Sequence, residues 1–425
     1  MLRVSSPIAS LIEPIAPARL GRSFRWLLAS AIVDNVGDGI VLSAGPLLIA
    51  ALTRDPFVVS LAVLARVMPP LLFGIVAGTV ADRIERRLIV IGVNVGRAVV
   101  LAILATMIAT GTASIAIVLA AIFILGTAET FADIGTSSLL PGLVRREDLG
   151  TANARIQGAF ILTNQLLLPP VGAFLFVIGM SVPFAVDAAC VALGAVLISR
   201  VATSGLGTGE ADDPRPAEEP RRSVRAEVVE GLRWLIGHPP MRTLALTIVA
   251  FNVTWGAAWG VLVLYARDRL GMDAVGFGLL TTASALGGVL GTLAYGRLTR
   301  ALSLGNIMRI GLLIETVTHL VLALTTSSIV VLVTMFVFGV HAFVWGTTAT
   351  TIRQRAVPDA LLGRVTGVYT VGIYGGIAVG TPIGGLLAGQ FGLTAPFWFA
   401  FVGSALLVGI LWRQFDHIAH AGAPT

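Results

Sequence analysis

The sequence predicts an all-α polytopic membrane protein with 12 transmembrane helices, arranged as two similar six-helix halves. The 425-residue chain is 56% hydrophobic and 12% charged, whereas an average soluble protein has about 25% charged residues. Apolar runs of about 20 residues recur, and each can cross a hydrocarbon core of about 30 Å as a helix. Short motifs also recur at a constant offset in the second half of the chain.

The predicted spans follow one another with short polar connections. They cover residues 25–51, 57–81, 88–109, 112–137, 152–178, 182–201, 241–265, 274–296, 305–325, 328–350, 363–389 and 394–413. The N-terminal half is residues 25–201 and the C-terminal half is residues 241–413, with a segment 1–24, a linker 202–240 and a tail 414–425 outside them. In the linker, Val224, Val228, Leu232 and Leu235 share one helical face. This predicts an amphipathic helix, either on the membrane surface or packed on cytoplasmic loops.

The distribution of basic residues predicts the orientation. All 29 are arginine, and most lie in the N-terminal segment, the linker and alternate loops, as on a cytoplasmic face. We therefore place both termini and the linker in the cytoplasm, and expect insertion without a cleavable signal peptide. This loop bias accounts for the formal charge of +6, so no nucleic-acid partner is expected. The lone Cys190 excludes an intrachain disulfide and a multi-cysteine metal site, and we expect no cofactor and no metal.

An internal repeat links the two halves. A charged turn at residues 78–87 has a degenerate copy at 291–300, which is 213 residues later. Leu-Gly pairs at 149–150 and 362–363 and Pro-Phe pairs at 183–184 and 396–397 keep the same offset, and Pro170 and Pro382 differ by 212. A constant offset at separate places indicates two parallel halves with a central pathway between them.

The turn at 78–87 carries a family resemblance. Its pattern is a glycine, three residues, Asp-Arg and a basic pair, here Gly78, Asp82, Arg83, Arg86 and Arg87, with Glu85 where a glycine is usual. The chain thereby resembles the major facilitator superfamily over nearly its whole length. Residues 35–39, 140–149 and 230–239 are similar to its bacterial drug and siderophore exporters, the group that includes macrolide efflux and enterobactin export proteins.

The resemblance implies a cytoplasmic gate. The charges of the turn would hold the halves together in the outward-facing state, with Asp82 near the positive N-terminal end of the eleventh helix. The alternative is that these arginines only set the topology. Residues 169–173 and 376–385 resemble the exporters' Gly-Pro motif. Their glycines let helices approach closely and Pro170 and Pro382 bend the axis, which suits gating, although ordinary small-residue packing would use the same residues.

Ionisable residues inside the spans are candidate functional groups, because a charge at mid-bilayer costs at least about 2.5–3.5 kcal/mol. The proton-coupling candidates are Asp34, Asp38, Arg66, Glu129 and Asp133. Asp34 is the first choice for the coupling acid and Asp38 the second, with an Asp38–Arg66 ion pair as the structural alternative. Glu129 and Asp133 are expected to pair with Arg83 or Arg86.

Other ionisable residues carry weaker expectations. Arg97 lies near the estimated depth of Asp34, and Asp187 is expected to be a shallow helix-contact residue. Glu315 and His319 are four residues apart and could share a proton. His341 is isolated in the sequence, which favours a satisfied buried histidine.

Aromatic and amide residues predict a substrate surface. Phe251, Trp255 and Trp259 repeat every four residues on the seventh helix, beside Asn252. Amides in the N-terminal half add hydrogen-bonding groups, namely Asn35, Asn164 and Gln165. Aromatic faces with a few polar groups suit a large amphipathic ligand. The alternative is that the stripe packs against lipid or neighbouring helices.

Together these features predict a monomeric secondary transporter in the bacterial cytoplasmic membrane. We expect it to export amphipathic small molecules, such as drugs, secondary metabolites or siderophores, by alternating access in exchange for protons. The alternative is uptake, or transport of lipid-like substrates, by the same fold. An enzyme is not expected, because the sequence has no His-x-x-x-His, no Cys-x-x-Cys and no Walker loop. The duplicated turn and the midplane acids argue against a channel or receptor.

Overall fold

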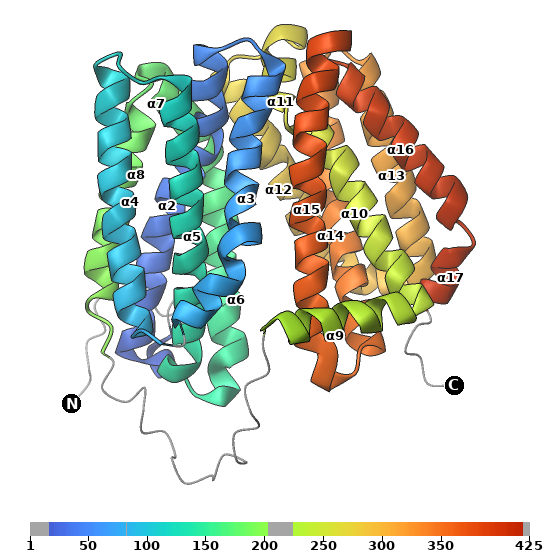
Figure 1. Ribbon diagram of the computed structural model, residues 1–425, viewed down its shortest axis with the longest axis horizontal. Helices are drawn as coiled ribbons and strands as arrows, with labels where there is room; N and C mark the ends of the chain where they lie inside the picture. Colours follow the sequence, from blue (N-terminus) through green and yellow to red (C-terminus); the bar gives the residue numbers. More distant parts are fainter. Residues whose placement is uncertain (1–16, 82, 203–223, 420–425) are drawn as a thin grey trace, which may run out of the picture. The chain divides into compact units, whose positions relative to one another are not determined.

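The computed structural model describes residues 17–81, 83–202 and 224–419, and within these ranges all regular structure is helical. In the N-terminal half, α2 to α8 provide the six predicted spans (Figure 1), the fifth of which is composite. The elements are the 3₁₀ turn η1 (Ala18–Leu20), α2 (Gly21–Leu52), α3 (Pro56–Ala81), α4 (Arg86–Ala109), α5 (Ile115–Leu143), the 3₁₀ turn η2 (Arg146–Asp148), α6 (Leu149–Phe160), the π-helix η3 (Ile161–Leu167), α7 (Leu168–Ile178) and α8 (Val182–Ile198).

The C-terminal half supplies the other six spans, of which the first is broken. They run from α10 to α16, with α9 before them and α17 after. The elements are α9 (Val224–Gly237), α10 (Pro239–Trp259), α11 (Leu262–Leu264), the π-helix η4 (Tyr265–Arg269), α12 (Ala274–Ala301), α13 (Leu304–Leu324), α14 (Ser328–Ala356), α15 (Asp359–Phe391), α16 (Ala395–Leu411) and α17 (Gln414–Ala419).

The helices match the predicted spans one to one. Among the described residues, nine helical segments are long and apolar enough to cross a membrane, and α10 with its continuation, bent by 41°, is a tenth. The remaining two predicted spans are α8 and α16, apolar helices of 17 residues each, or about 26 Å at 1.5 Å per residue. Because backbone groups in a hydrocarbon core must bond to one another, continuous helices are the expected form.

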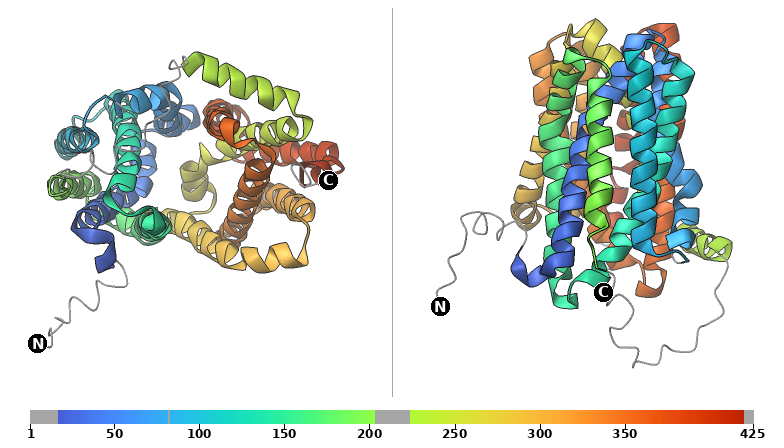
Figure 2. Two further views of the ribbon diagram at one scale, coloured as in Figure 1. Left: turned by 90° about the horizontal axis from the view of Figure 1, so that it is seen from below. Right: turned by 90° about the vertical axis from the view of Figure 1, so that its left-hand side faces the viewer.

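The structure divides into two compact units. The first contains residues 1–45 and 72–217, and the second contains residues 46–71 and 218–425. In the first unit α4 packs against α5 and α8, and in the second α13 packs against α14 and α16 while α10 packs against α15. Figure 2 shows the helices of each unit end-on. The predicted domain limits at residues 25–201 and 241–413 remain predictions.

The internal repeat is visible in the helix limits. Both ends of α8 and α16 differ by 213 residues, and so do both ends of α5 and α14. The pairing of α4 with α5 and α8 recurs as the pairing of α13 with α14 and α16. The second copy of the charged turn differs from expectation, because residues 291–300 are part of the continuous helix α12. Arg300 lies in its last turn, where a cation complements the helix dipole.

Glycines allow two pairs of backbones to come into contact. A Cβ atom at Gly172 of α7 would collide with the backbone of Ile40 in α2. Gly380 and Gly384 of α15 lie in the same way against the backbone of α10, at Val253 and Ala257. The close approach expected of the two Gly-Pro motifs is therefore present in both. The halves differ in shape, since residues 161–167 form a π-helix before Pro169 whereas Pro382 lies inside a continuous α15.

The linker helix α9 packs on the second unit, and its predicted position on the membrane surface stays a prediction. Leu235 is buried in the core of the second unit, and Glu230 Oε2 accepts a hydrogen bond from Arg364 Nη1 of α15 at 3.0 Å. Val228 and Leu232, which share a helical face with Leu235, are exposed. The helix thus packs on α15 and retains an apolar face of the kind that lies on a membrane surface.

Candidate transport site

A buried ion pair lies at the centre of the first unit. Arg97 of α4 is 5% exposed and forms a salt bridge with Asp38 of α2. Arg97 also interacts electrostatically with Asp34, Asp187 and Glu129. The pairing of Asp38 with Arg97 was not predicted. The position of a residue along a helix gives its approximate depth in the membrane, but it does not show which neighbouring helix its side chain faces.

Asp34 lies one turn before Asp38 and uses only one of its carboxylate oxygens. Its Oδ2 accepts hydrogen bonds from Asn94 Nδ2 at 3.1 Å and from Ser30 Oγ at 3.4 Å. Its Oδ1 is buried without a hydrogen-bond partner. This oxygen lies over Gly194 of α8, where any side chain would collide with the carboxylate. Asp34 is therefore held at the α2–α8 contact with one oxygen available to carry a proton.

Asp187 is the functional candidate that sequence reasoning undervalued. It was expected to be shallow, because it is the sixth residue of α8. Its side chain is only 3% exposed and faces Gly37 of α2, and its Oδ1 also lacks a hydrogen-bond partner. The small Gly37 between Asn35 and Asp38 was the signal for this arrangement, because a glycine leaves space for a group from another helix.

The two glycines make the α2–α8 contact reciprocal. Asp34 on α2 occupies the space above Gly194 on α8, and Asp187 on α8 occupies the space above Gly37 on α2. Asp34, Asp38, Asp187 and Glu129 all act electrostatically on the guanidinium group of Arg97. Burial disfavours the charged form of a carboxylate, and a nearby arginine favours it. The predicted Asp38–Arg66 pair stays a prediction, because its two residues belong to different units.

Two of the proposed gating residues, Arg86 and Arg87, contact other helices of their own unit. Asp82 lies outside the described residues. Arg86 Nη1 donates to the carbonyl oxygen of Ser138 on α5 at 2.9 Å, and Arg87 Nη2 donates to that of Ser199 after α8 at 2.6 Å. Both arginines thus satisfy carbonyl groups near helix C-termini, where cations are favourable. The latch between halves and the pairing of Glu129 or Asp133 with Arg83 or Arg86 remain predictions.

The predicted substrate residues of the N-terminal half lie near the same helix contact. Asn164 is buried in the π-helix η3, and Gln165 follows it and is half-buried. The backbone of Asn164 lies against Gly39 of α2. Asn35 is half-buried and donates to the carbonyl oxygen of Ala31 at 2.7 Å. Single-turn π segments often occur at functional sites, and this one was not foreseen from the sequence.

The aromatic stripe of α10 packs inside the second unit. Trp255 and Trp259 stack with ring centroids 4.8 Å apart, and Phe251 stacks on Trp345 of α14 at 6.1 Å. Asn252 is buried and donates to the carbonyl oxygen of Ile248. These contacts agree with the alternative interpretation, in which the stripe packs against neighbouring helices. A role of the stripe in binding substrate stays a prediction.

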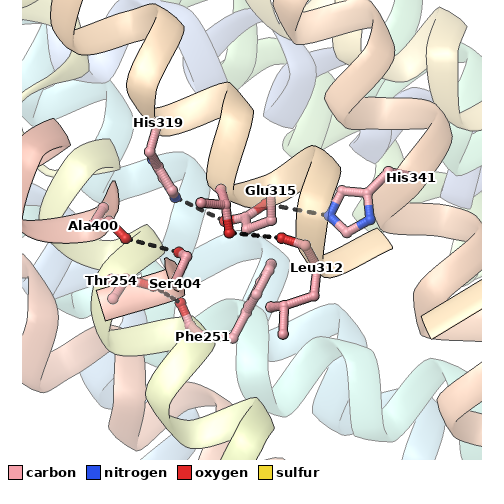
Figure 3. A network of polar contacts seen from close by, with 9 residues as sticks. Phe251, Thr254, Leu312, Glu315, His319, His341, Ala400 and Ser404 are labelled. Carbon is pink, nitrogen blue, oxygen red and sulfur yellow. Dashed lines mark hydrogen bonds and ion pairs between the residues drawn. The ribbon is translucent and has the colours of Figure 1, made fainter. Parts of the chain in front are cut away.

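The second unit holds a polar cluster that the sequence only partly indicated. Glu315 and His319 of α13 are hydrogen-bonded, as their spacing suggested. His341 of α14 is the satisfied buried histidine that was expected, and its partner, which the sequence did not indicate, is the other oxygen of Glu315. Figure 3 shows the three side chains converging from the two helices. Their meeting depends on the packing of α13 on α14, which joins residues 26 positions apart.

Comparison with known proteins agrees with this architecture. Residues 12–420 match the family of transmembrane secretion effectors. Over 398 residues the chain is 26% identical to the enterobactin exporter EntS of Escherichia coli O1:K1 / APEC, covering 87% of this chain and 89% of that exporter. The values are the same for EntS of Shigella boydii serotype 4 (strain Sb227).

Solved structures show the same fold. The nucleoside transporter NupG matches with a TM-score of 0.71 and 13% identity, covering 94% of this chain and 99% of NupG. A bacterial homologue of the iron transporter ferroportin, in the inward-facing state, matches with a TM-score of 0.70 and 16% identity, covering 93% of this chain and 98% of that protein. At these identities the likeness concerns the fold alone.

Proposed function

We propose, from the premise that this chain belongs to the transmembrane secretion effector family of the major facilitator superfamily, that it exports siderophore-like amphipathic molecules in exchange for protons. At the coarser level the chain is a multi-pass membrane transporter of the bacterial inner membrane and not an enzyme. Export direction, substrate and proton coupling are the proposal. Its supports are the buried aspartates of the first unit and the exporter relatives.

The aspartate cluster carries the proton-coupling part of the proposal. Asp34 is half-buried and has an oxygen without a hydrogen-bond partner, and Arg97 acts electrostatically on it as on Asp38, Asp187 and Glu129. Such a group changes its proton occupancy when access to water changes, because ionisation is unfavourable in an apolar surrounding. A transporter that alternates access can use this change to exchange a proton for substrate. We therefore assign Asp34 as the coupling acid.

The proposed substrate class is supported by the similar exporters and by the aromatic residues of α10. The similar exporters are named for enterobactin, and Phe251, Trp255 and Trp259 offer rings that suit an aromatic, amphipathic ligand. We propose that these rings, with Asn252 and the N-terminal amides Asn35, Asn164 and Gln165, contact the substrate. Pro170 and Pro382, together with the charged turn around Asp82, are proposed to gate the pathway.

Everted membrane vesicles test direction and coupling together. Vesicles containing the protein, acidified inside, are expected to accumulate enterobactin from the medium, and a protonophore should abolish the accumulation. Vesicles without the protein are the control. An importer would empty preloaded vesicles instead, and a lipid transporter would move a labelled phospholipid between leaflets. Failure to accumulate enterobactin or a panel of other siderophores and amphipathic drugs would refute the proposed substrate class.

Replacing Asp34 by asparagine is expected to uncouple transport from the proton gradient. Asparagine keeps an oxygen that can accept from Asn94 and Ser30 but cannot release a proton. Gradient-driven accumulation should fall to the level of empty vesicles, while exchange of labelled for unlabelled substrate continues. Glu147→Gln, in an exposed loop, is the control and should retain both activities. Gradient-driven accumulation by Asp34→Asn would remove Asp34 from the coupling role.

Replacing Asp82 by asparagine tests the proposed latch. We expect transport to fall while the amount of protein inserted in the membrane stays normal, because the carboxylate would act in the conformational cycle and the arginines set the topology. Transport per inserted protein is the measurement. A variant that inserts and transports normally would show that the turn is a topology signal only.

A further inference from the structure

The polar cluster of the second unit is a hydrogen-bonded triad in which Glu315 lies between His319 and His341. Glu315 is fully buried on α13, and its Oε1 lies 2.8 Å from Nε2 of His319. Its Oε2 lies 3.2 Å from Nε2 of His341 on α14. Both histidines are buried as well. In Figure 3 the carboxylate lies between the two imidazole rings.

The contacts define where hydrogen atoms can lie. An ionised carboxylate only accepts hydrogen bonds, so each imidazole must present Nε2–H to it. In neutral rings the other nitrogen, Nδ1, then carries no hydrogen. The Nδ1 atoms of His319 and His341 are both buried with no hydrogen-bond partner. The triad therefore has a charge of −1 while both rings are neutral, and it has two positions at which it can take up a proton.

Among the described residues of the second unit, the neighbouring helices place no positively charged side chain at the depth of the triad. The nearby hydroxyl groups of Thr254, Thr316 and Ser404 bond to carbonyl oxygens of their own helices. His341 contacts the rings of Phe251 and Phe338. The described charged residues of the neighbouring helices lie toward the helix ends and in α17, namely Arg242, Arg297, Arg300, Arg309, Arg353, Arg355 and His417. α16 contains no ionisable residue.

One added proton makes this buried group neutral. A net charge in an apolar interior is unfavourable, and histidine is the side chain that exchanges protons near physiological pH. We propose that Glu315, His319 and His341 together bind one exchangeable proton, at a site separate from the aspartate cluster of the first unit. The added proton goes to an imidazole nitrogen from water, and no other bond changes.

The triad contacts the aromatic stripe that is proposed to bind substrate. His341 lies edge-on to Phe251, which stacks on Trp345. His319 lines a cavity of about 10 Å³ together with Trp255 and Trp259, which is room for about one water molecule. A change in protonation at the triad therefore occurs next to the residues of α10. The site gives the C-terminal half its own proton-dependent element.

The geometry favours a proton over a metal ion. Each Nε2 points to a different oxygen of Glu315, so the contacts are two hydrogen bonds and not ligands converging on one point. Within the described ranges of the chain, no group of three histidine, cysteine or acidic residues is arranged to hold a metal.

Nitrogen-15 NMR of histidine-labelled protein in liposomes tests the proposal without any substrate. The chain has five histidines, and His319→Asn and His341→Asn assign the two signals. We expect both rings to be Nε2–H tautomers at high pH, and one proton to be added at Nδ1 as the pH is lowered. In Glu315→Gln the negative charge is absent, so both rings should stay neutral throughout. Glu315→Asp should retain the titration.

The outcomes separate a proton site from a structural network. Rings that stay neutral to about pH 5 in the wild-type protein, or that titrate identically in Glu315→Gln, would overturn the proposal. The wild-type titration needs no variant, so it decides the question even where Glu315→Gln folds poorly. The exposed Glu147→Gln is the matched control and should leave both signals unchanged. Because no transport is measured, this result is independent of the proposed export function.

Discussion

Replacing Arg97 by glutamine is expected to remove most of the folded protein. Arg97 is 5% exposed and pairs with Asp38, and its charge also acts on Asp34, Asp187 and Glu129. Removing one partner of a buried ion pair costs about 3–5 kcal/mol, and here Asp38 would lose its contact with the guanidinium group. That is a large part of the roughly 5–15 kcal/mol that stabilises a typical folded protein. The yield of monodisperse protein and its thermal unfolding midpoint in detergent measure the loss.

A double variant identifies the cause. In Arg97→Gln with Asp38→Asn, both charges of the pair are absent, and part of the lost stability should return. Arg145→Gln is the control, because Arg145 also pairs with an acid, Glu147, but is 82% exposed, and exposed pairs contribute only about 0–1 kcal/mol. Wild-type stability of the single variant would show that the pair does not hold this unit together.

Replacing Gly384 by alanine is expected to separate α15 from α10. A Cβ atom at this position would overlap the backbone of Ala257, and a backbone cannot move aside as a flexible side chain can. Overpacking of this kind costs about 1–3 kcal/mol and occasionally more. The thermal unfolding midpoint of the purified protein should fall clearly, and transport should fall with it if α15 moves against α10 during the cycle.

Gly389 of the same helix provides a matched control. It is exposed, and a Cβ atom there would meet no atom within 4 Å. Gly389→Ala should be neutral or slightly stabilising, because alanine is about 1 kcal/mol better than glycine in a helix. Equal effects of the two substitutions would contradict the close-packing role of Gly384.

The helices were predictable because hydrocarbon leaves the backbone few choices. The limits agree with the predicted spans to within a few residues at most ends, and the largest differences are helical extensions such as the last turns of α5 and α14. The last turns of α14 contain Arg353 and Arg355, which are not expected in a membrane-spanning segment, whereas those of α5 contain Pro141 and Gly142, which favour the end of a helix. The π-helix at 161–167 and the break after Trp259 were not predicted, because they depend on local packing around prolines and glycines.

The sequence identified most residues of the candidate site but not the residues that they contact. Asp34 and Asp38 stood out because charges are rare in apolar runs, but their partners Asn94 and Arg97 lie on another helix. Asp187 was undervalued because depth along α8 does not tell which way its side chain faces. The partner of His341, Glu315, was not predicted for the same reason. The direction of a side chain around its helix requires the neighbouring helix to be known.

The amino-acid sequence was enough to predict the membrane class, the 12 spans, the repeat and the family resemblance. These four features follow from the composition, the length of the apolar runs and short motifs. Each can be recognised within one segment of the sequence or by comparing two segments. Several contacts became apparent from the helix packing and not from the sequence. Arg97 pairs with Asp38, and Glu315 bonds to two histidines. Asp34 packs on Gly194, and Asp187 packs on Gly37. The physical reason is that a buried charge is stabilised by groups from other helices, and helix packing alone selects those groups.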